Sequence, residues 1–267
     1  MKGQRRLLQG IALCLLFTGL FLTGCSGNAA GGNKRLRIGV RADIMNFGYL
    51  NEKSGKYYGF EIDLANELSE KLGYGAPEFV TVTPDSRKEM LLSGEVDALI
   101  ACYSISDTRL ENFDFSPAYY HDAIRIMAER SSLLETPKDL LGKRIGILRG
   151  SNAGPLFAIK MSELGLVTEE PNFSPDTYAN GFSYVQADSY EELSQLLEDG
   201  RADVAVLDGS IAQTYMNEDR MFLSEEVEPQ DYGVATQKGS ALSAPMAEAV
   251  QALLDDGTVA RLIDKWN

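Results

Sequence analysis

Two parts of the chain share one sequence pattern, and this internal repeat constrains the fold more than any other feature. The segment Arg37-Ile38-Gly39-Val40 recurs 107 residues later as Arg144-Ile145-Gly146-Ile147. A pattern of leucine, glycine and aspartate that begins at Leu91 recurs 106 residues later at Leu197, and each copy leads into a short apolar run. Two matches at nearly one offset predict two similar α/β lobes. Coincidence is the alternative, because glycines at helix ends are common.

The first 24 residues are predicted to be absent from the mature protein. They carry three basic residues before an apolar run and contain no acid, which is typical of a secretion signal. The run is short and is interrupted by threonine and glycine, which disfavours the alternative of a membrane span. Leu22-Thr23-Gly24-Cys25 resembles the lipobox of bacterial lipoproteins, so we expect lipidation of Cys25. Residues 25–33 are mostly small and polar, which predicts a flexible tether.

The charge of the remaining chain limits its partners. Removing residues 1–24 leaves 243 residues, enough for two domains, and lowers the formal net charge from −14 to −17 because three basic residues are lost. Such a surface repels nucleic acid and anionic lipid. We therefore expect no nucleic-acid partner, and we expect contact with the cell membrane only through the lipid on Cys25.

Cysteine and histidine are too few for a disulfide framework or a zinc site. Cys25 and Cys102 are the cysteines outside the signal, and a lipidated Cys25 leaves Cys102 without a disulfide partner. His121 is the single histidine and has no second ligand at metal-binding spacing. We expect neither a metal nor a cofactor.

The stretch Asp97–Arg109 predicts a ligand site. The apolar run Val96–Ala101, which overlaps its start, is typical of a buried parallel strand, and the following residues include Cys102, Tyr103, Ser104 and Arg109. In open α/β sheets, ligands bind at the carboxyl ends of the strands. A guanidinium and hydroxyls suit a carboxylate ligand. The alternative is that Arg109 pairs with a neighbouring acid, Asp107 or Glu111, on an exposed turn.

The second lobe has two corresponding strand ends. The strand that includes Ile145–Leu148 is followed by the small-residue turn Arg149–Gly154, and backbone N–H groups at such a helix start favour an anion. Val204–Leu207 is an apolar strand that ends at Asp208. Asp208 could also be only a helix N-cap, a common role for aspartate before Gly209-Ser210.

Five segments of the chain resemble the polar-amino-acid solute-binding proteins of ABC importers, and the resemblance covers nearly the whole mature chain. The segments are Gly59–Leu64, Ser104–Arg109, Phe113–Tyr120, Gly142–Gly146, and Asp256-Gly257-Thr258 through Lys265-Trp266. The resemblance implies a periplasmic-binding-protein fold of type 2, in which two α/β lobes joined by a two-strand hinge close on one amino acid. It implies a first lobe of residues 34–122 and 230–267, with a returning strand over 232–236, and a second lobe of residues 123–229.

By the same resemblance, Arg109 would hold the α-carboxylate of the ligand, with help from Ser104 and from the backbone near Cys102. Ser151 and Asn152 would add donors to that carboxylate from the second lobe. Asp208 would bind the α-ammonium group. The chain departs from the family at two places. Ile44 stands where many members have an aromatic residue, and Asn152 stands where threonine is usual.

Extra positive charge near the predicted site favours an acidic ligand. Arg41 follows the first strand and Arg87 begins the helix after the second, and Ser86-Arg87 resembles a Thr-Arg pair of the acidic-amino-acid branch. A second carboxylate on the ligand would explain both arginines, so glutamate or aspartate is expected, with glutamine next.

Both of these arginines have a plainer interpretation, in which each pairs with an acid of the protein. Arg87 could pair with Glu89 or Asp85 on an exposed helix face, and Arg41 could pair with Asp43.

We therefore predict a monomeric extracytoplasmic receptor, anchored by lipidated Cys25, that delivers an amino acid to the membrane subunits of an ABC permease. The alternative is a cleft enzyme of the same fold, such as a cyclohexadienyl-type dehydratase. An enzyme needs an acid or base beyond the groups that hold the ligand, and the predicted strand ends supply no pair of nucleophile and base.

Overall fold

The structure is a computed structural model, and it describes residues 35–167, 173, 175 and 181–266. Within these residues no helix combines the length and the apolar character needed to cross a membrane. The predicted signal, the tether and the lipidation site Cys25 lie outside the described residues.

The first sheet has the strand order β5-β1-β6-β13-β7. Its strands are β1 Arg37–Val40, β5 Glu78–Thr81, β6 Ala98–Ile100, β7 Phe113–Phe115 and β13 Ala235–Gln237. Strand β1 is parallel to both of its neighbours, whereas β13 is antiparallel to β6 and β7. The accompanying helices are α1 Phe60–Lys71, α2 Arg87–Leu92, α3 Asp107–Leu110, α7 Ser243–Asp255 and α8 Thr258–Trp266. A small sheet follows β1 and contains β2 Asp43–Ile44, β3 Gly48–Asn51 and β4 Lys56–Tyr58.

The second sheet has the order β10-β9-β11-β8-β12. Its strands are β8 Tyr120–Glu129, β9 Arg144–Leu148, β10 Ser183–Ala187, β11 Val204–Asp208 and β12 Arg220–Tyr232. Its helices are α4 Ala153–Glu163, α5 Tyr190–Glu198 and α6 Gly209–Gln213, and two short 3-10 helices cover Arg130–Ser132 and Pro137–Leu140. Strand β9 is parallel to β10 and β11, as β1 is parallel to β5 and β6.

The sequence repeat has a structural cause that both sheets share. The guanidinium of Arg37, at the start of β1, forms an ion pair of 2.7 Å with Asp97, which directly precedes β6. Arg144, at the start of β9, pairs with Asp203 before β11 at 2.8 Å. In both copies the same aspartate also accepts the backbone N–H of the arginine. The prediction of two similar α/β halves is confirmed.

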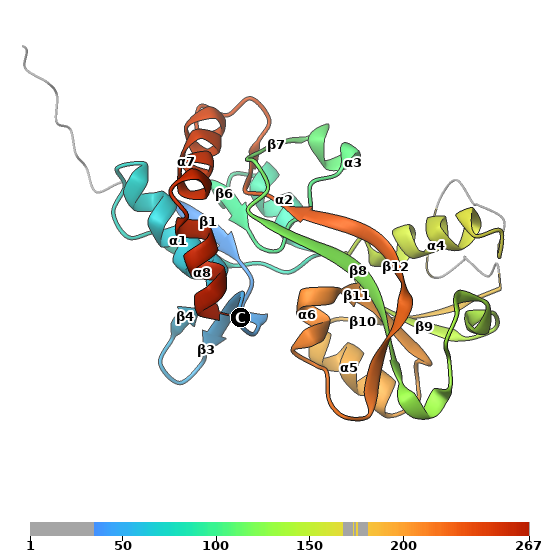
Figure 1. Cartoon of the computed structure of the whole chain (residues 1–267). Coiled ribbons are helices and arrows are strands. Elements are labelled where there is room, and N and C mark those ends of the chain that lie inside the picture. The colour runs from blue at the N-terminus through green and yellow to red at the C-terminus, as the bar shows by residue number, and fades with distance from the viewer. Residues whose placement is uncertain (1–34, 168–172, 174, 176–180, 267) are drawn as a thin grey trace, which may run out of the picture. The chain divides into compact units, whose positions relative to one another are not determined.

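Strands β8 and β12 run antiparallel side by side, with Tyr120 opposite Tyr232 and Asp122 opposite Gln230 (Figure 1). The predicted lobe boundaries, after residues 122 and 229, fall inside these two strands. The expected returning strand over 232–236 is instead divided, because β12 ends at Tyr232 and β13 begins at Ala235.

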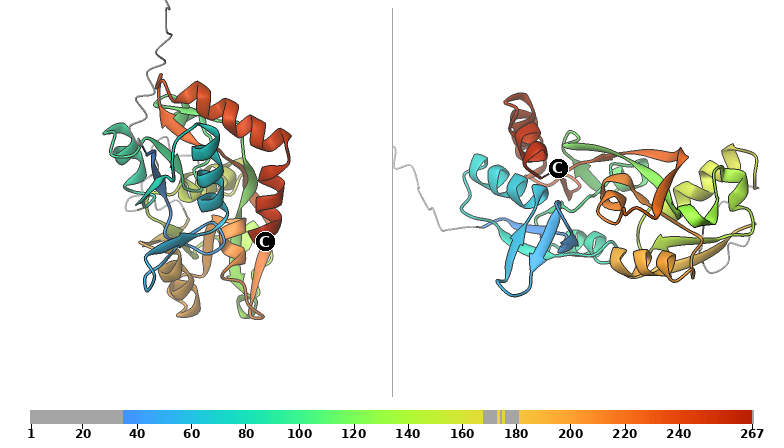
Figure 2. Two further views of the ribbon diagram at one scale, coloured as in Figure 1. Left: turned by 90° about the vertical axis from the view of Figure 1, so that its left-hand side faces the viewer. Right: turned by 60° about the horizontal axis from the view of Figure 1, so that its bottom comes forward.

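The chain ends in α7 and α8, which pack against α1 (Figure 2). Gly257 separates the two helices with a φ of 75°, a conformation that glycine adopts without strain. The apolar residues of β1, β6 and α1 are buried together, so the core of the first sheet fixes where the carboxyl ends of its strands lie.

Candidate ligand-binding site

The turn after β6 is held by a buried carboxylate. Glu61 is fully buried, and its Oε1 accepts hydrogen bonds from the backbone N–H of Cys102 at 2.7 Å and from the hydroxyl of Tyr119. Cys102 has a φ of 46°, which is unusual for a residue with a side chain. Burial raises the pKa of Glu61, and it raises the pKa of the Cys102 thiol well above its ordinary value. In this conformation the N–H of Cys102 is already used inside the protein.

Arg109 lies beside this turn and forms no ion pair with a described residue. Its Nη1 donates to the carbonyl of Ser104 at 2.7 Å and to the Ser104 hydroxyl, and its guanidinium lies 4.2 Å from the ring centre of Tyr103. In the described part of the chain, neither of the two neighbouring acids pairs with it. Burial and the nearby Arg87 lower the pKa of Arg109 to about 10. The surroundings of Arg109 therefore disfavour its positive charge.

Arg87 is a second cation in contact with Tyr103. It is 5% exposed, lies 4.5 Å from the ring centre of Tyr103 and donates to the carbonyl of Ala101 at 2.8 Å. Its Nε is buried without a hydrogen-bond partner, and the carboxylates of Asp85 and Glu89 do not pair with it among the described contacts. Burial and the charge of Arg41 lower its pKa.

Arg41, unlike Arg87, pairs with an acid of the protein, which was the alternative given for it in the sequence analysis. It is 2% exposed, and its guanidinium donates two hydrogen bonds to the carboxylate of Asp43, at 2.9 and 2.7 Å. Burial opposes its charge, but attraction to Tyr190 and Asp43 prevails and raises its pKa. Arg41 is therefore neutralised by the protein.

Asp208 ends β11 and stands at the N-cap position of α6, but its side chain makes no capping hydrogen bond. It is 8% exposed and forms no ion pair with a described residue. Burial, followed by repulsion from Asp122, raises the pKa of Asp208 to about 6. The structure thus places a buried carboxylate without a counter-ion at this strand end.

The turn after β9 reaches the first sheet through Asn152. Its Nδ2 donates to the Ser104 hydroxyl at 3.2 Å and to the side-chain carbonyl of Gln230 at 2.8 Å. The Ser151 hydroxyl donates to the carbonyl of Leu148 at 2.8 Å. Ser104, Arg109 and Asn152, which are far apart in sequence, are thereby brought together.

Sequence analysis did not single out Glu61 or Tyr190 as parts of the site. Tyr190 is the first residue of α5, is buried, and lies with its ring 5.4 Å from the guanidinium of Arg41. Burial and the charge of Asp208 raise its pKa. Ser189, whose hydroxyl caps α5, marks the helix start at the carboxyl end of β10, and this signal could have identified Tyr190.

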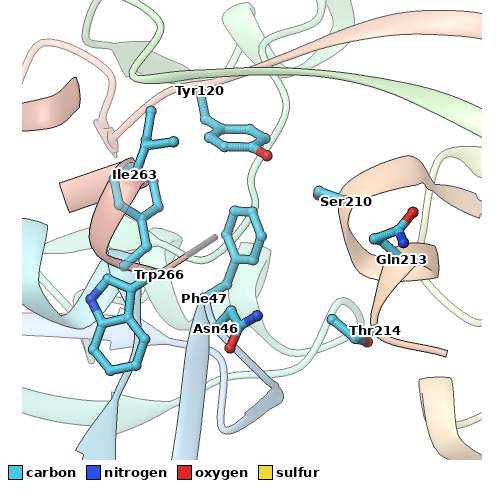
Figure 3. A pocket seen from close by; sticks show the side chains of 9 residues that line it. Asn46, Phe47, Tyr120, Ser210, Gln213, Thr214, Ile263 and Trp266 are labelled. Carbon is cyan, nitrogen blue, oxygen red and sulfur yellow. The ribbon is translucent and has the colours of Figure 1, made fainter. Parts of the chain in front are cut away.

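Two pockets differ sharply in charge. One, of about 320 Å³, is lined by Arg87, Tyr103 and Arg109 together with residues of the Pro84-Asp85 turn and Gly150. The other, of about 350 Å³, is lined by neutral side chains, which Figure 3 shows. They are Asn46, Phe47, Phe60, Tyr120, Ser210, Gln213, Thr214, Ile263 and Trp266. A ligand with a carboxylate finds its counter-charge only at the first of these two pockets. No group of three potential metal ligands occurs among the described residues.

Comparison with known proteins finds relatives that match nearly the whole chain. A protein of Bacillus subtilis (strain 168), the ABC transporter glutamine-binding protein GlnH, is 23% identical over 278 residues, which cover 96% of this chain and 95% of the relative. The arginine-binding extracellular protein ArtP of the same organism is 27% identical over 273 residues, 98% of each chain. Among solved structures, an ancestral arginine-binding protein bound to arginine is similar with a TM-score of 0.73 and 28% identity, over 87% of this chain and 97% of that chain.

The fold is accordingly that of the type 2 periplasmic binding proteins, as predicted. The model that describes the bacterial extracellular solute-binding proteins, family 3, matches residues 36–267, nearly everything after the predicted signal and tether. The chain belongs to the bacterial extracellular solute-binding proteins, family 3.

Proposed function

We propose that the protein is the receptor of an amino-acid ABC importer, and that it binds one polar amino acid between two lobes and delivers it to the permease. The relatives named above bind glutamine or arginine, according to their names. The observation that carries the proposal is that Arg109 and Asp208 are opposite charges without a counter-ion among the described residues, at strand ends of two sheets. A zwitterion supplies both missing partners.

The α-carboxylate of the ligand binds Arg109 and the Ser104 hydroxyl from one sheet. Ser151, Asn152 and the N-terminal turn of α4 supply donors from the other. Asn152 donates to the Ser104 hydroxyl at 3.2 Å, and a bound carboxylate would replace that contact. The α-ammonium group binds Asp208.

We further propose an acidic ligand, glutamate or aspartate, with glutamine next. The support is Arg87, a buried guanidinium without a carboxylate partner in the described chain and with an unpartnered Nε. The ring of Tyr103 contacts the guanidinium of Arg87, and the Nη1 of Arg87 lies 3.4 Å from the carbonyl oxygen of Cys102. Arg41 takes no part in charge recognition in this proposal, because Asp43 neutralises it. A cationic side chain would be repelled by Arg87.

Binding is proposed to close the two predicted lobes, residues 34–122 with 230–267 and residues 123–229, about β8 and β12. A ligand that contacts both lobes favours the closed form by its difference in affinity for the two forms. Closure is the state that a permease can recognise. The protein is proposed to act as a monomer, outside the cytoplasm, with lipidated Cys25 as its membrane anchor.

A cleft enzyme, such as a cyclohexadienyl-type dehydratase, is not retained. The family consists of solute-binding proteins, and both relatives named above are named as amino-acid-binding proteins.

A thermal-shift panel of the twenty amino acids at pH 7.5 tests the proposal. A ligand present at a hundred times its Kd stabilises the protein by about 2.7 kcal/mol. We expect the largest shift with L-glutamate or L-aspartate. Stabilisation by arginine, lysine or histidine alone would refute the acidic ligand, and no shift with any amino acid would refute the receptor function.

A further inference from the structure

Asp122 lies on β8, at the point where the chain passes between the two sheets, and its carboxylate caps a helix of the site. It accepts the backbone N–H of Ser210 at 3.1 and 3.2 Å and also the Ser210 hydroxyl. It also accepts the N–H of its own neighbour Ala123 at 2.8 Å. Asp122 therefore supplies the cap of α6 that Asp208, in the N-cap position, does not supply.

The hydroxyl of Tyr232 stands between two carboxylates. Tyr232 is fully buried on β12, and its hydroxyl donates to Asp122 Oδ2 at 3.0 Å. The same hydroxyl also faces Asp208 and offsets part of the rise in the pKa of that carboxyl. A phenol has one proton to donate, and in this structure Asp122 receives it.

The other charged and titratable groups that face Asp208 come from the surrounding elements. They are Arg87 of α2, Arg109 of α3, Tyr190 of α5 and Cys102 of the turn after β6. Arg125 of β8 lies against the neighbouring Gly209. Arg125 pairs with Glu226 at 3.3 Å. For the pKa of Asp208, burial and the repulsion from Asp122 outweigh the attraction of Arg87 and Arg109.

We propose that Asp122 is a positioning residue of the ammonium subsite: it holds Ser210 and the Tyr232 hydroxyl and leaves Asp208 short of donors, so that a proton and the ligand's ammonium group compete for Asp208. This rests on the proposed function, in which Asp208 binds the α-ammonium group. Asp122 acts through Tyr232 and through its own charge, and it is not itself a ligand contact.

The test is calorimetric measurement of Kd at pH 5 and pH 8 with L-glutamate, L-glutamine and L-arginine. The α-carboxylate and α-ammonium groups of all three keep their charges between these pH values, so the pH dependence shared by the ligands reports the protein. Wild type is compared with Asp122→Asn and Tyr232→Phe. The matched control is Asp231→Asn, an exposed aspartate of the same strand pair that contacts His121 instead of the site.

For wild type we expect Kd at pH 5 to exceed Kd at pH 8 about tenfold, because a carboxyl that titrates near pH 6 is mostly protonated at pH 5. In Asp122→Asn the repulsion is gone, and the ratio should fall below about threefold. In Tyr232→Phe the hydroxyl that offsets part of the rise in the pKa of Asp208 is gone, and the ratio should rise above that of wild type. Asp231→Asn should keep the wild-type ratio.

Equal ratios in wild type and Asp122→Asn would overturn this inference and leave the proposed function standing. Failure of wild type to bind any of the twenty amino acids, in this measurement or in the thermal-shift panel, would overturn the proposed function and this inference with it. Should Asp122→Asn not fold, Tyr232→Phe decides alone, and a ratio no higher than that of wild type overturns the inference.

Discussion

The side chain of Glu61 accepts a hydrogen bond from the backbone N–H of Cys102, across 41 positions of sequence and at 2.7 Å. This bond joins the start of α1 to the turn that presents Tyr103 and Ser104. The turn has a positive φ at Cys102, so it needs support from outside its own segment.

Replacing Glu61 should therefore affect stability according to whether an acceptor remains. Glu61→Leu leaves the Cys102 N–H and the Tyr119 hydroxyl buried without a partner, which should cost about 2–4 kcal/mol in the free energy of unfolding. Glu61→Gln keeps an acceptor and should stay within about 1 kcal/mol of wild type. Urea denaturation measures both. Equal stability of Glu61→Leu and wild type would contradict the role of this bond.

Arg87→Met should discriminate between ligands. It removes the proposed partner of the side-chain carboxylate, so the Kd for L-glutamate should rise about a hundredfold or more. The Kd for L-glutamine should rise less than about tenfold, because no charge is left unpaired. Arg37→Met is the control, since Arg37 pairs with Asp97 at the opposite ends of the strands. An equal loss of affinity for both ligands would mean that Arg87 does not bind the side-chain carboxylate of glutamate.

Asp208→Asn should make the stability of the protein less dependent on pH and should weaken ligand binding. The folded-state pKa of about 6 lies above the unfolded value of about 3.9, so the native state binds more protons between these values. Stability of the ligand-free wild type should therefore fall as pH rises from 4 to 6, by at most about 3 kcal/mol. Denaturation of Asp208→Asn at both pH values should show a smaller fall.

The same variant should lose affinity for its amino acid by more than about a hundredfold, because the ligand's ammonium group loses its buried partner. Calorimetry at pH 8 checks this. A change in Kd below about threefold in the folded variant would remove Asp208 from the ammonium subsite.

Gly150→Ala should hinder closure. Gly150 has a φ of 71°, and an added Cβ would lie 2.4 Å from the carboxylate and 2.8 Å from the backbone nitrogen of Asp85. Ligand affinity should fall, and small-angle scattering should show less compaction with ligand than wild type. Gly165→Ala is a matched control, because Gly165 has a φ of 69° and no atom of a described residue lies within 4 Å of an added Cβ. Equal effects of the two variants would attribute the loss to backbone strain alone.

The fold could be predicted from the sequence because its signals are local and repeated. Arg37 pairs with Asp97, and Arg144 pairs with Asp203. Both pairs lie in the repeated segments, so the repeat can be seen in the sequence itself. The predicted strand over 232–236 overlaps β12 at Tyr232 alone, because the acids and Pro229 of β12 lack the apolar alternation of a strand. As an edge strand it tolerates both.

The sequence could not show which charged residues of the site are paired within the protein and which are not. Arg41 and Arg87 each have acids close by in sequence, but only Arg41 is paired with one in the described structure. Glu61 and Asp122 act through contacts with segments 41 and 88 or more residues away, which periodicity does not reveal.

The two arginine-aspartate pairs that mark the repeat bind the strands together at their amino ends, whereas Arg109, Asp208 and Asn152 follow the carboxyl ends. The ion pairs at the amino ends thus hold the strands of each sheet in register, and the residues at the carboxyl ends are not needed for this. Substitutions at the carboxyl edge can change which molecule is bound while the register of both sheets is kept. The architecture therefore offers a starting point for redesigning ligand choice one residue at a time.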